Sequence, residues 1–286
     1  MSTPSVDRPL AGQIGVVTGG AGGIGAGTTR ALAELGMRVV IVDIDADLAT
    51  HTAQQISEDT GIDVTSRHVD VVDSDAMSAL AADITNNLGP VRLLYNNAGV
   101  MPMGPILENC VDDWRWLFDV NLIGVANGIT AFAPRMLAHG LPSRLLTTAS
   151  MAAFAPNDAF PIYTASKQAV LGVIEALRME LEGTNIAVSV VCPGAVNTGI
   201  GLSERNRPAR YGPASGRAVP VGAEQEKARL QLIEGDEAGR RIVREMMADE
   251  FWIFTHPEWA RKIRSRFDDA YEAAQRALQR RPDIGR

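Results

Sequence analysis

Residues 14–25 read IGVVTGGAGGIG, and this stretch decides the fold. Its first five residues form a short apolar run, which is typical of a buried strand, and the glycines after it are typical of a tight turn. From Gly23 to about Gly36 the pattern is that of an amphipathic helix. Glycines between a buried strand and a helix let the backbone approach a pyrophosphate, which the positive N-terminal end of the helix attracts. The stretch therefore predicts a dinucleotide-binding turn, although a plain tight turn has the same composition.

The alternation of short apolar strands with helices continues along most of the chain. The other expected strands are 38–43, 64–69, 92–95, 144–149, 186–192 and a short last one at 251–255. The later helices are expected to end near 60 and to span 74–88, 113–139 (with Pro134 as a point of kinking or ending) and 163–183. Strands that are apolar along their whole length and joined by helices are covered on both faces. The sequence thus predicts an α/β fold, a Rossmann-like, doubly wound parallel sheet with helices on both faces.

A chain of 286 residues with this rhythm is expected to form a single Rossmann-like domain over residues 1–286. Its expected parts are a cofactor-binding core at about 10–198, a substrate lid inserted at about 199–248, and the last strand with a helical C-terminal tail at about 250–286. Within the insert, residues 203–222 are rich in Arg, Pro and Gly and predict a mobile loop, whereas residues 223–247 have a helical pattern.

Composition argues against several classes of function. A net charge of −7 disfavours nucleic acid or an anionic membrane as a partner, because both attract basic surfaces. The start of the chain has no signal-peptide pattern and no run approaches about 18 apolar residues, so we expect a cytoplasmic protein. Two cysteines without metal-ligand spacing fit a reducing compartment. No metal is expected, because the histidines share no ligand spacing; they are His51, His68, His139 and His256.

Asp43 ends the second expected strand, about 20 residues beyond the glycine turn, where an acidic side chain can bond the ribose hydroxyls of a dinucleotide. A carboxylate at this place repels a 2′-phosphate, and the neighbouring Ile44 offers no basic group. The sequence therefore favours NAD over NADP. The alternative is that Asp43 only caps the next helix.

Tyr163 and Lys167 are four residues apart on an expected helix and therefore face the same way. A free tyrosine has a pKa of about 10 and is a poor base at neutral pH. A nearby ammonium and a positive nicotinamide both favour the phenolate and move this pKa toward the working range. Ser150, at the end of an expected strand, can bond a substrate oxygen as charge develops on it. The alternative is an exposed helix face with a solvent-reaching lysine.

Further short motifs follow the glycine turn in a fixed order. They are Asn96-Asn97-Ala98-Gly99, Asn121 in VNLIGV, Ser150 in TTAS, Tyr163-Thr164-Ala165-Ser166-Lys167, and Pro193-Gly194 followed by Thr198. The turn itself has the form TGxxxGxG, with Thr18, Gly19, Gly23 and Gly25. In this order the series is highly specific, and over about residues 10–255 it resembles the short-chain dehydrogenase/reductase family.

The resemblance implies an NAD(H)-dependent alcohol dehydrogenase or ketoreductase with Asn121, Ser150, Tyr163 and Lys167 as catalytic residues. In this family the asparagine helps to hold a water that links the lysine to bulk solvent. The implied cofactor contacts are Thr18, Gly19, Gly23, Ile24, Gly25, Asp43, Ile44, Asp70, Val71, Asn97, Ala98, Gly99, Tyr163, Lys167, Pro193, Gly194, Val196 and Thr198. Family members usually form homotetramers or homodimers by packing the helices around 113–139 and 163–183.

The substrate pocket is expected to be apolar and covered by the insert, which favours a bulky hydrophobic or aromatic secondary alcohol or ketone over a sugar. The expected substrate contacts are Ser150, Ala152, Phe154, Phe160 and Ala195. Trp116 is assigned instead to core or subunit packing. Two segments, VNLIGVANGITAFAPRM at 120–136 and SERNRPARYG at 203–212, resemble bacterial Cα-dehydrogenases of lignin-derived aryl ethers and related bulky-ketone dehydrogenases.

Three alternatives remain open at this point. Steroid and terpenoid alcohols are competing substrates for the same kind of pocket. The extended epimerases and dehydratases also use a glycine turn and a YxxxK pair, but they generally carry a longer substrate domain. A non-enzymatic NAD-binding regulator on this fold is expected to have lost Ser150, Tyr163 or Lys167, and none is lost.

Overall fold

The computed structural model describes residues 8–280 except 215 and 218–230, and within them the chain forms one seven-stranded sheet. The strands are β1 (Ile14–Thr18), β2 (Arg38–Asp43), β3 (Val64–His68), β4 (Val91–Asn96), β5 (Ser143–Thr148), β6 (Ile186–Cys192) and β9 (Trp252–Phe254). Every neighbouring pair is parallel, in the order β3-β2-β1-β4-β5-β6-β9. The predicted Rossmann-like parallel sheet is confirmed.

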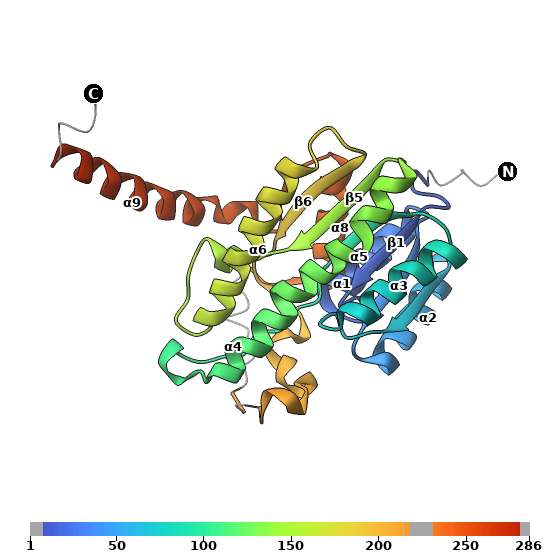
Figure 1. Cartoon of the computed structure of the whole chain (residues 1–286), viewed down its shortest axis with the longest axis horizontal. Coiled ribbons are helices and arrows are strands. Elements are labelled where there is room, and N and C mark those ends of the chain that lie inside the picture. Colours follow the sequence, from blue (N-terminus) through green and yellow to red (C-terminus); the bar gives the residue numbers. More distant parts are fainter. Residues whose placement is uncertain (1–7, 215, 218–230, 281–286) are drawn as a thin grey trace.

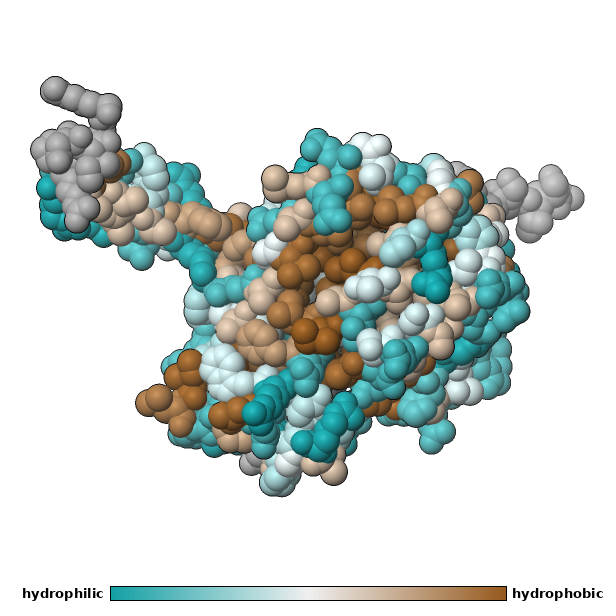
Figure 2. All heavy atoms as spheres, viewed as in Figure 1, coloured by the Kyte–Doolittle hydropathy of each residue, from teal (hydrophilic) through white to brown (hydrophobic). Residues whose placement is uncertain are grey.

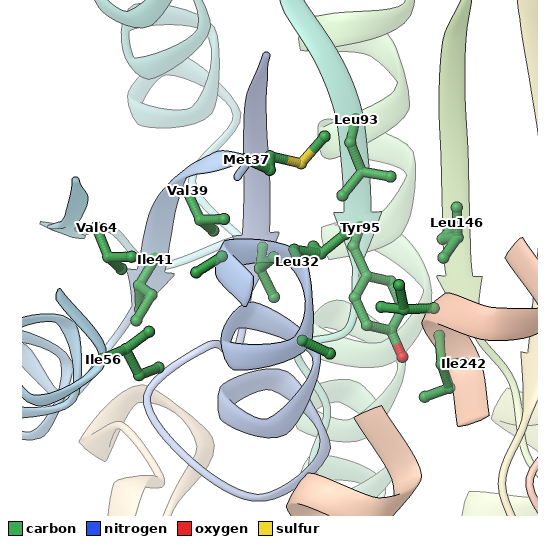
Figure 3. Packing of buried hydrophobic residues seen from close by; sticks show 14 of the residues in the cluster. Leu32, Met37, Val39, Ile41, Ile56, Val64, Leu93, Tyr95, Leu146 and Ile242 are labelled. Atoms are coloured by element: carbon green, nitrogen blue, oxygen red, sulfur yellow. The ribbon is translucent and has the colours of Figure 1, made fainter. Parts of the chain in front are cut away.

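Helices cover both faces of this sheet (Figure 1). One face is packed by α1 (Gly23–Glu34), α2 (Ala46–Thr60) and α8 (Gly235–Met247), and the other by α3 (Ser74–Asn87), α5 (Gly124–His139) and α6 (Pro161–Glu180). Figure 3 shows the first of these layers, in which Leu32 of α1 and Ile242 of α8 meet the sheet. On β2, Ile41 faces this layer whereas Val40 and Val42 face the other. Alternate residues of a strand face opposite sides of the sheet, so a strand that is apolar throughout needs helices on both sides, as its sequence predicted.

Helices α1 and α8 touch backbone to backbone. A Cβ built on Gly27 of α1 overlaps the carbonyl of Gly235, and one built on Gly239 overlaps the backbone of Gly27. Only glycine permits this approach. The contact fastens the helix that follows the insert to the helix that begins at the glycine turn.

The long helix expected over 113–139 consists of three consecutive pieces, α4 (Val111–Phe118), a π-helical turn at Asp119–Ile123, and α5. It does not end at Pro134, which lies inside α5; the irregularity is instead the π turn, which carries Asn121. By length and composition alone, Val111–His139 could cross a membrane. Half of its most apolar window is buried in the protein, and Phe132 and Met136 are fully buried against the sheet, as in a core helix.

The described part of the insert forms 3₁₀ turns at Gly199–Asn206 and Ala209–Tyr211. Of the mobile loop expected over 203–222, residues 215 and 218–222 lie outside the described residues. A two-stranded sheet of β7 (Val196–Asn197) and β8 (Ile233–Glu234) then leads into α8. Of the helix expected over 223–247, residues 235–247 are helical as α8, Ile233 and Glu234 belong to β8, and residues 223–230 lie outside the described residues.

The C-terminal tail is helical, as expected, and begins with a 3₁₀ turn at Pro257–Trp259. It continues as α9 (Ala260–Gln279), which projects away from the rest of the molecule (Figure 1). Two further 3₁₀ turns, Ile106–Glu108 and Met151–Ala153, follow β4 and β5.

Candidate functional site

A cleft runs across the carboxyl ends of the parallel strands, on both sides of the point between β1 and β4 where the strand order reverses. Ligands of doubly wound sheets bind in such a crevice. One end is walled by the glycine turn, Asp43 and Asp70; the other holds Ser150, Tyr163 and Lys167. The cleft thus joins the predicted cofactor site to the predicted reaction site.

The glycine turn is held in a shape that only glycines adopt. Gly19 and Gly23 have φ angles of +61° and +52°, and a Cβ on Gly25 would overlap the carbonyl oxygen of Gly19. The side chain of Asn97 braces the turn, since its Nδ2 donates to the carbonyls of Thr18 and Gly19 at 3.1 and 3.0 Å. Helix α1 begins here without a side-chain cap on Gly22, so its first N–H groups face the cleft. This glycine cradle fits a pyrophosphate.

Thr18 and Gly25 act behind the cleft wall and do not line it. The Thr18 hydroxyl accepts hydrogen bonds from the backbone N–H groups of Asn97 and Ala98 at 2.9 and 3.1 Å. It therefore ties the end of β4 to the end of β1 and sets Ala98 and Gly99 on the wall beside the turn.

Asp43 lies in the cleft wall, as its position after β2 predicted. Its two carboxylate oxygens accept hydrogen bonds from the backbone N–H groups of Ala21 and Asp45, at 3.0 and 3.1 Å. The cap of α2 is a different residue, Asp45, whose side chain accepts from Leu48 N. The alternative in which Asp43 serves only as that cap is therefore wrong. The carboxylate is held at the ribose end of the cleft and keeps lone pairs for further donors.

Tyr163 and Lys167 lie on one face of α6 and are both buried, so the exposed-face alternative is also wrong. The Lys167 side chain is held in place, because its Nζ donates to the carbonyl of Thr148 at 2.9 Å and lies 5.6 Å from the centre of the Tyr163 ring. Burial lowers the pKa of Lys167 to about 8. Burial also raises the pKa of Tyr163 to about 12, against the opposing effect of a hydrogen bond with Ser150. Burial alone therefore moves the pKa of this tyrosine away from neutral pH, so the expected lowering depends on positive charge beside the phenol.

Asn121 comes to the same place from the π-helical turn. Its Oδ1 accepts from Val100 N at 2.8 Å, and its Nδ2 donates to Val100 O and to Ser166 Oγ at 3.1 and 3.0 Å. A Cβ on Gly99 would lie 3.3 Å from Asn121 Oδ1 and 3.6 Å from Lys167 Nζ, so these two polar atoms flank one glycine. The four residues expected to be catalytic are thus brought together.

Ser150 lies two residues beyond the end of β5 and caps the 3₁₀ turn that follows, accepting from Ala152 N at 3.0 Å. Of the residues expected to contact substrate, only Ser150 lines the cleft; Ala152, Phe154, Phe160 and Ala195 do not. Phe154 instead packs in a separate apolar cluster among Trp252, Phe254 and Phe267. Phe160 packs edge-on against the Tyr163 ring at 6.0 Å and supports it.

The substrate end of the cleft is covered by residues that the sequence motifs did not indicate. Its apolar lining comes from Val100, Trp116, Val120, Ile200 and Pro208. The segment 198–211, hereafter the roof, also brings Arg205 and Arg210 to the cleft. Trp116 was assigned to packing, and although it is almost fully buried it also lines the cleft. No local pattern distinguishes these residues from ordinary helix and loop positions.

A buried ion pair fastens the roof to α4. The Arg207 guanidinium pairs with Asp113, with only 2% and 6% of their side chains exposed, and it lies 5.2 Å from the centre of the Trp116 ring. It also donates to the carbonyl of Tyr211. Burial works to raise the pKa of Asp113, but hydrogen bonds from Arg207 and Cys110 outweigh it and hold this pKa below its ordinary value.

Two further contacts secure the end of the roof. The Tyr211 hydroxyl donates to Asp119 at 2.8 Å. Arg210 pairs with Asp70 at 2.8 Å, at the end of the cleft that holds the glycine turn and Asp43. The roof therefore spans both ends of the cleft. Among the described residues, no group of three or more His, Cys, Asp or Glu side chains is placed to hold a metal ion.

The chain is similar in sequence and structure to known dehydrogenases. Residues 13–208 match the family model described as short chain dehydrogenase. The chain is 34% identical to a 1-deoxy-11-beta-hydroxypentalenate dehydrogenase of Streptomyces avermitilis, over 90% of this chain and 89% of that protein. It is 32% identical to a C alpha-dehydrogenase of a Sphingobium species, over 86% of this chain and 81% of the relative. A crystal structure of a short chain dehydrogenase/reductase from Burkholderia phymatum in complex with NAD superimposes with a TM-score of 0.83, at 31% identity, covering 92% of this chain and 96% of that one.

Proposed function

Because this chain belongs to the short-chain dehydrogenase family and is an oxidoreductase of secondary alcohols and ketones, we propose that it uses NAD and that Tyr163 is its general acid and base. The observation that carries the proposal is the convergence of Ser150, Tyr163 and Lys167 at one end of a cleft whose other end is the glycine cradle with Asp43. The site is proposed to act on a small molecule inside a cytoplasmic homo-oligomer.

The proton steps follow from the geometry of three side chains. In alcohol oxidation the Tyr163 oxygen accepts the hydroxyl proton of the substrate, and in ketone reduction it returns a proton to the carbonyl oxygen. Ser150 Oγ bonds the same substrate oxygen as negative charge develops on it. NAD, when bound, supplies the hydride acceptor and a positive nicotinamide ring. Lys167 adds a second positive charge while it is protonated, and together these charges oppose the rise in the Tyr163 pKa that burial causes.

The carboxylate of Asp43 supports NAD over NADP. An acidic side chain at the end of the second strand of such folds bonds the ribose hydroxyls and repels a 2′-phosphate, and Asp43 is held at this position by Ala21 N and Asp45 N. Arg210, the nearest basic residue of the roof at this end, is already paired with Asp70.

A bulky hydrophobic alcohol or ketone is the proposed substrate class. The apolar lining of Val100, Trp116, Val120, Ile200 and Pro208 supports contact with a hydrophobic substrate. Relatives named for a hydroxypentalenate and for a Cα alcohol are consistent with such a substrate. The first of these names also favours a second candidate, a terpenoid or steroid alcohol.

The proposal is tested by mixing the purified protein with NAD or NADP and a panel of alcohols. The panel includes aryl, terpenoid and steroid secondary alcohols and a sugar, and NADH formation is followed by absorbance. We expect NAD reduction with at least one bulky secondary alcohol and little with the sugar. Failure to reduce either cofactor with any alcohol, together with failure to oxidise NADH with the matching ketones, would refute the activity. Higher kcat/KM with NADP would refute the role of Asp43 alone.

A further inference from the structure

The connection from β6 to β7 is held by hydrogen bonds at both of its ends. The carbonyl of Pro193 accepts from Met151 N at 2.9 Å, and Met151 directly follows Ser150. The carbonyl of Ala195 accepts from Ile233 N of β8 at 3.2 Å. The first bond ties the connection to the reaction site, and the second ties it to the end of the insert.

Between these two bonds, Gly194 is held by two buried residues that follow β9. Its N–H donates to Thr255 Oγ1 at 3.1 Å, and the Thr255 hydroxyl lies 2.8 Å from His256 Nδ1. His256 Nε2 lies 3.0 Å from the carbonyl oxygen of Gln231, at the end of the insert. Thr255 is fully buried and only 1% of His256 is exposed. The two side chains therefore complete a row of hydrogen bonds that runs from the insert to the cleft wall.

The two ends of this row fix the direction of every bond in it, because a backbone N–H only donates and a carbonyl oxygen only accepts. His256 must carry its proton on Nε2 to donate to Gln231 O, which leaves Nδ1 to accept from the Thr255 hydroxyl. The Thr255 oxygen in turn accepts from Gly194 N. A charged imidazole would donate from both nitrogens and leave the buried Thr255 O–H without an acceptor among the described residues. The row thus requires neutral His256 in one tautomer.

Packing fixes the same two residues. A Cβ built on Gly194 would lie 2.6 Å from ring atoms of His256, so glycine at this position leaves room for the ring. The carbonyl of Thr255 accepts from Arg241 of α8 at 2.7 Å, and the His256 ring lies 5.1 Å from that of Trp259. Beyond Trp259 the chain continues as α9, which stands clear of the body in Figure 2 and has no buried residue. The buried part of the tail is therefore its start, against the cleft wall.

This part of the wall lies where the nicotinamide ring has to bind. The ring exchanges its hydride beside the substrate oxygen that Ser150 and Tyr163 hold, whereas the pyrophosphate lies at the glycine cradle. The segment 193–198 spans the interval between them, since its first residue bonds Met151 and the methyl group of its last residue lies 2.8 Å from the place of a Cβ on Gly23. Most of this segment lines the cleft.

We propose that Thr255 and His256 are positioning residues for the nicotinamide end of the cofactor, an inference that rests on the proposed function. Through the N–H of Gly194 they set the wall against which the ring lies, and through Gln231 they link that wall to the end of the insert. Neither side chain lines the cleft, so neither touches the cofactor itself. The glycine cradle and Asp43 keep their own hydrogen bonds when this row is broken.

The test compares NADH with ADP-ribose, which has the adenosine and the pyrophosphate but no nicotinamide. Thr255→Val keeps the shape of the side chain and removes the hydroxyl. We expect it to weaken NADH binding by about tenfold, because the N–H of Gly194 loses its acceptor and the wall loosens. The fluorescence enhancement of bound NADH, which reports how firmly the nicotinamide is held, is expected to fall with it. ADP-ribose affinity, measured by calorimetry, is expected to change by less than about twofold.

Two further variants separate positioning from folding. Thr255→Ser restores the hydroxyl without the methyl group and is expected to return NADH affinity and fluorescence to near the wild-type values. His256→Phe keeps a ring beside Gly194 but removes the acceptor at Nδ1, and it is expected to act in the same direction as Thr255→Val, with a smaller loss. It carries the comparison if Thr255→Val does not fold, which circular dichroism establishes.

Thr184→Val is the matched control, because the Thr184 hydroxyl likewise accepts from a backbone N–H, that of Ile186, but at the opposite end of β6. It is expected to leave the affinities for both ligands unchanged. Folded Thr255→Val and His256→Phe variants that bind NADH as the control does would overturn the inference alone. Equal weakening of NADH and ADP-ribose would also overturn it, since the pair would then support the whole cleft. A wild-type chain that binds neither ligand would contradict the proposed function, and the inference with it.

Discussion

The two ends of the cleft are built in different ways. At the cofactor end, Thr18, Asp43 and Asn97 bond backbone groups of the strand ends and the glycine turn. The roof is held instead by side-chain pairs between distant parts of the chain, Arg207–Asp113 at the substrate end and Arg210–Asp70 at its far edge beside the cofactor end, which span 94 and 140 residues. The first kind of structure joins the ends of neighbouring parallel strands, so it follows from short motifs placed at those strand ends, although Thr18 and Asn97 are 79 residues apart. The second kind depends on contacts between side chains of distant segments, and its residues can differ between proteins that bind different substrates.

The largest effect is expected where the two ends meet, at the proton-transferring oxygen. Tyr163→Phe removes the hydroxyl but keeps the ring that packs against Phe160, so the fold and the cofactor end stay intact. We expect kcat to fall by about 10²–10⁴-fold, the usual contribution of a positioned acid or base, while NADH affinity changes little. Steady-state rates and fluorescence titration with NADH measure the two quantities. If NADH affinity fell in step with the rate, Tyr163 would belong to the cofactor end rather than to the reaction.

The next largest effect is expected from breaking the buried ion pair between Arg207 and Asp113. Arg207→Met leaves Asp113 buried without its partner, which costs about 3–5 kcal/mol for a buried pair if the site cannot relax. We expect a lower unfolding temperature and a higher KM for a bulky substrate, with the KM for NAD less affected. Thermal unfolding and kinetics measure these changes.

A matched control is available on the same helix. Arg115 pairs with Asp112 at the surface of α4, where both side chains are largely exposed. Arg115→Met is expected to change the unfolding free energy by less than about 1 kcal/mol. Equal effects of the two substitutions would show that the roof is not held by its buried pair.

A smaller change is expected from Asp43→Asn, which removes the charge at the ribose end but keeps the size of the side chain. Two unit charges about 4 Å apart repel each other by about 1 kcal/mol in water and by about 4 kcal/mol at an effective dielectric constant of about 20. The preference for NAD over NADP should therefore fall by about tenfold. The ratio of kcat/KM for the two cofactors measures it. An unchanged ratio would mean that another residue of the cleft sets the preference.

The contrast between the two ends also explains what the sequence could predict. The parallel sheet followed from the alternation of apolar strands and helices, and the convergence of Asn121, Ser150, Tyr163 and Lys167 followed from the family motifs that these residues match. The π turn that carries Asn121 was not expected, since no residue type marks it and Pro134 was a more obvious place for a break.

The substrate contacts were predicted less well, for a physical reason. Phe154 was assigned to the pocket because it is apolar and close to Ser150 in sequence, but the 3₁₀ turn after β5 directs it to the cluster around Trp252. Trp116 reaches the cleft because the roof folds back over α4, and that depends on Arg207 and Asp113, which no spacing rule connects. Local sequence patterns do not predict tertiary contacts of this kind.

The pH dependence of alcohol oxidation tests the central claim, that Tyr163 takes the substrate proton, most directly. Burial raises the pKa of Tyr163, so the phenol is mostly protonated at neutral pH and its phenolate fraction grows as pH rises. From about pH 6 to pH 7 Lys167 is mostly charged, and at pH 8 it is about half charged, because its pKa is about 8. Over this range kcat/KM for oxidation should rise, by up to about tenfold per pH unit at its lower end, while ketone reduction, which uses the protonated phenol, should change little. An oxidation rate that is flat or falls as pH rises over this range would contradict the account.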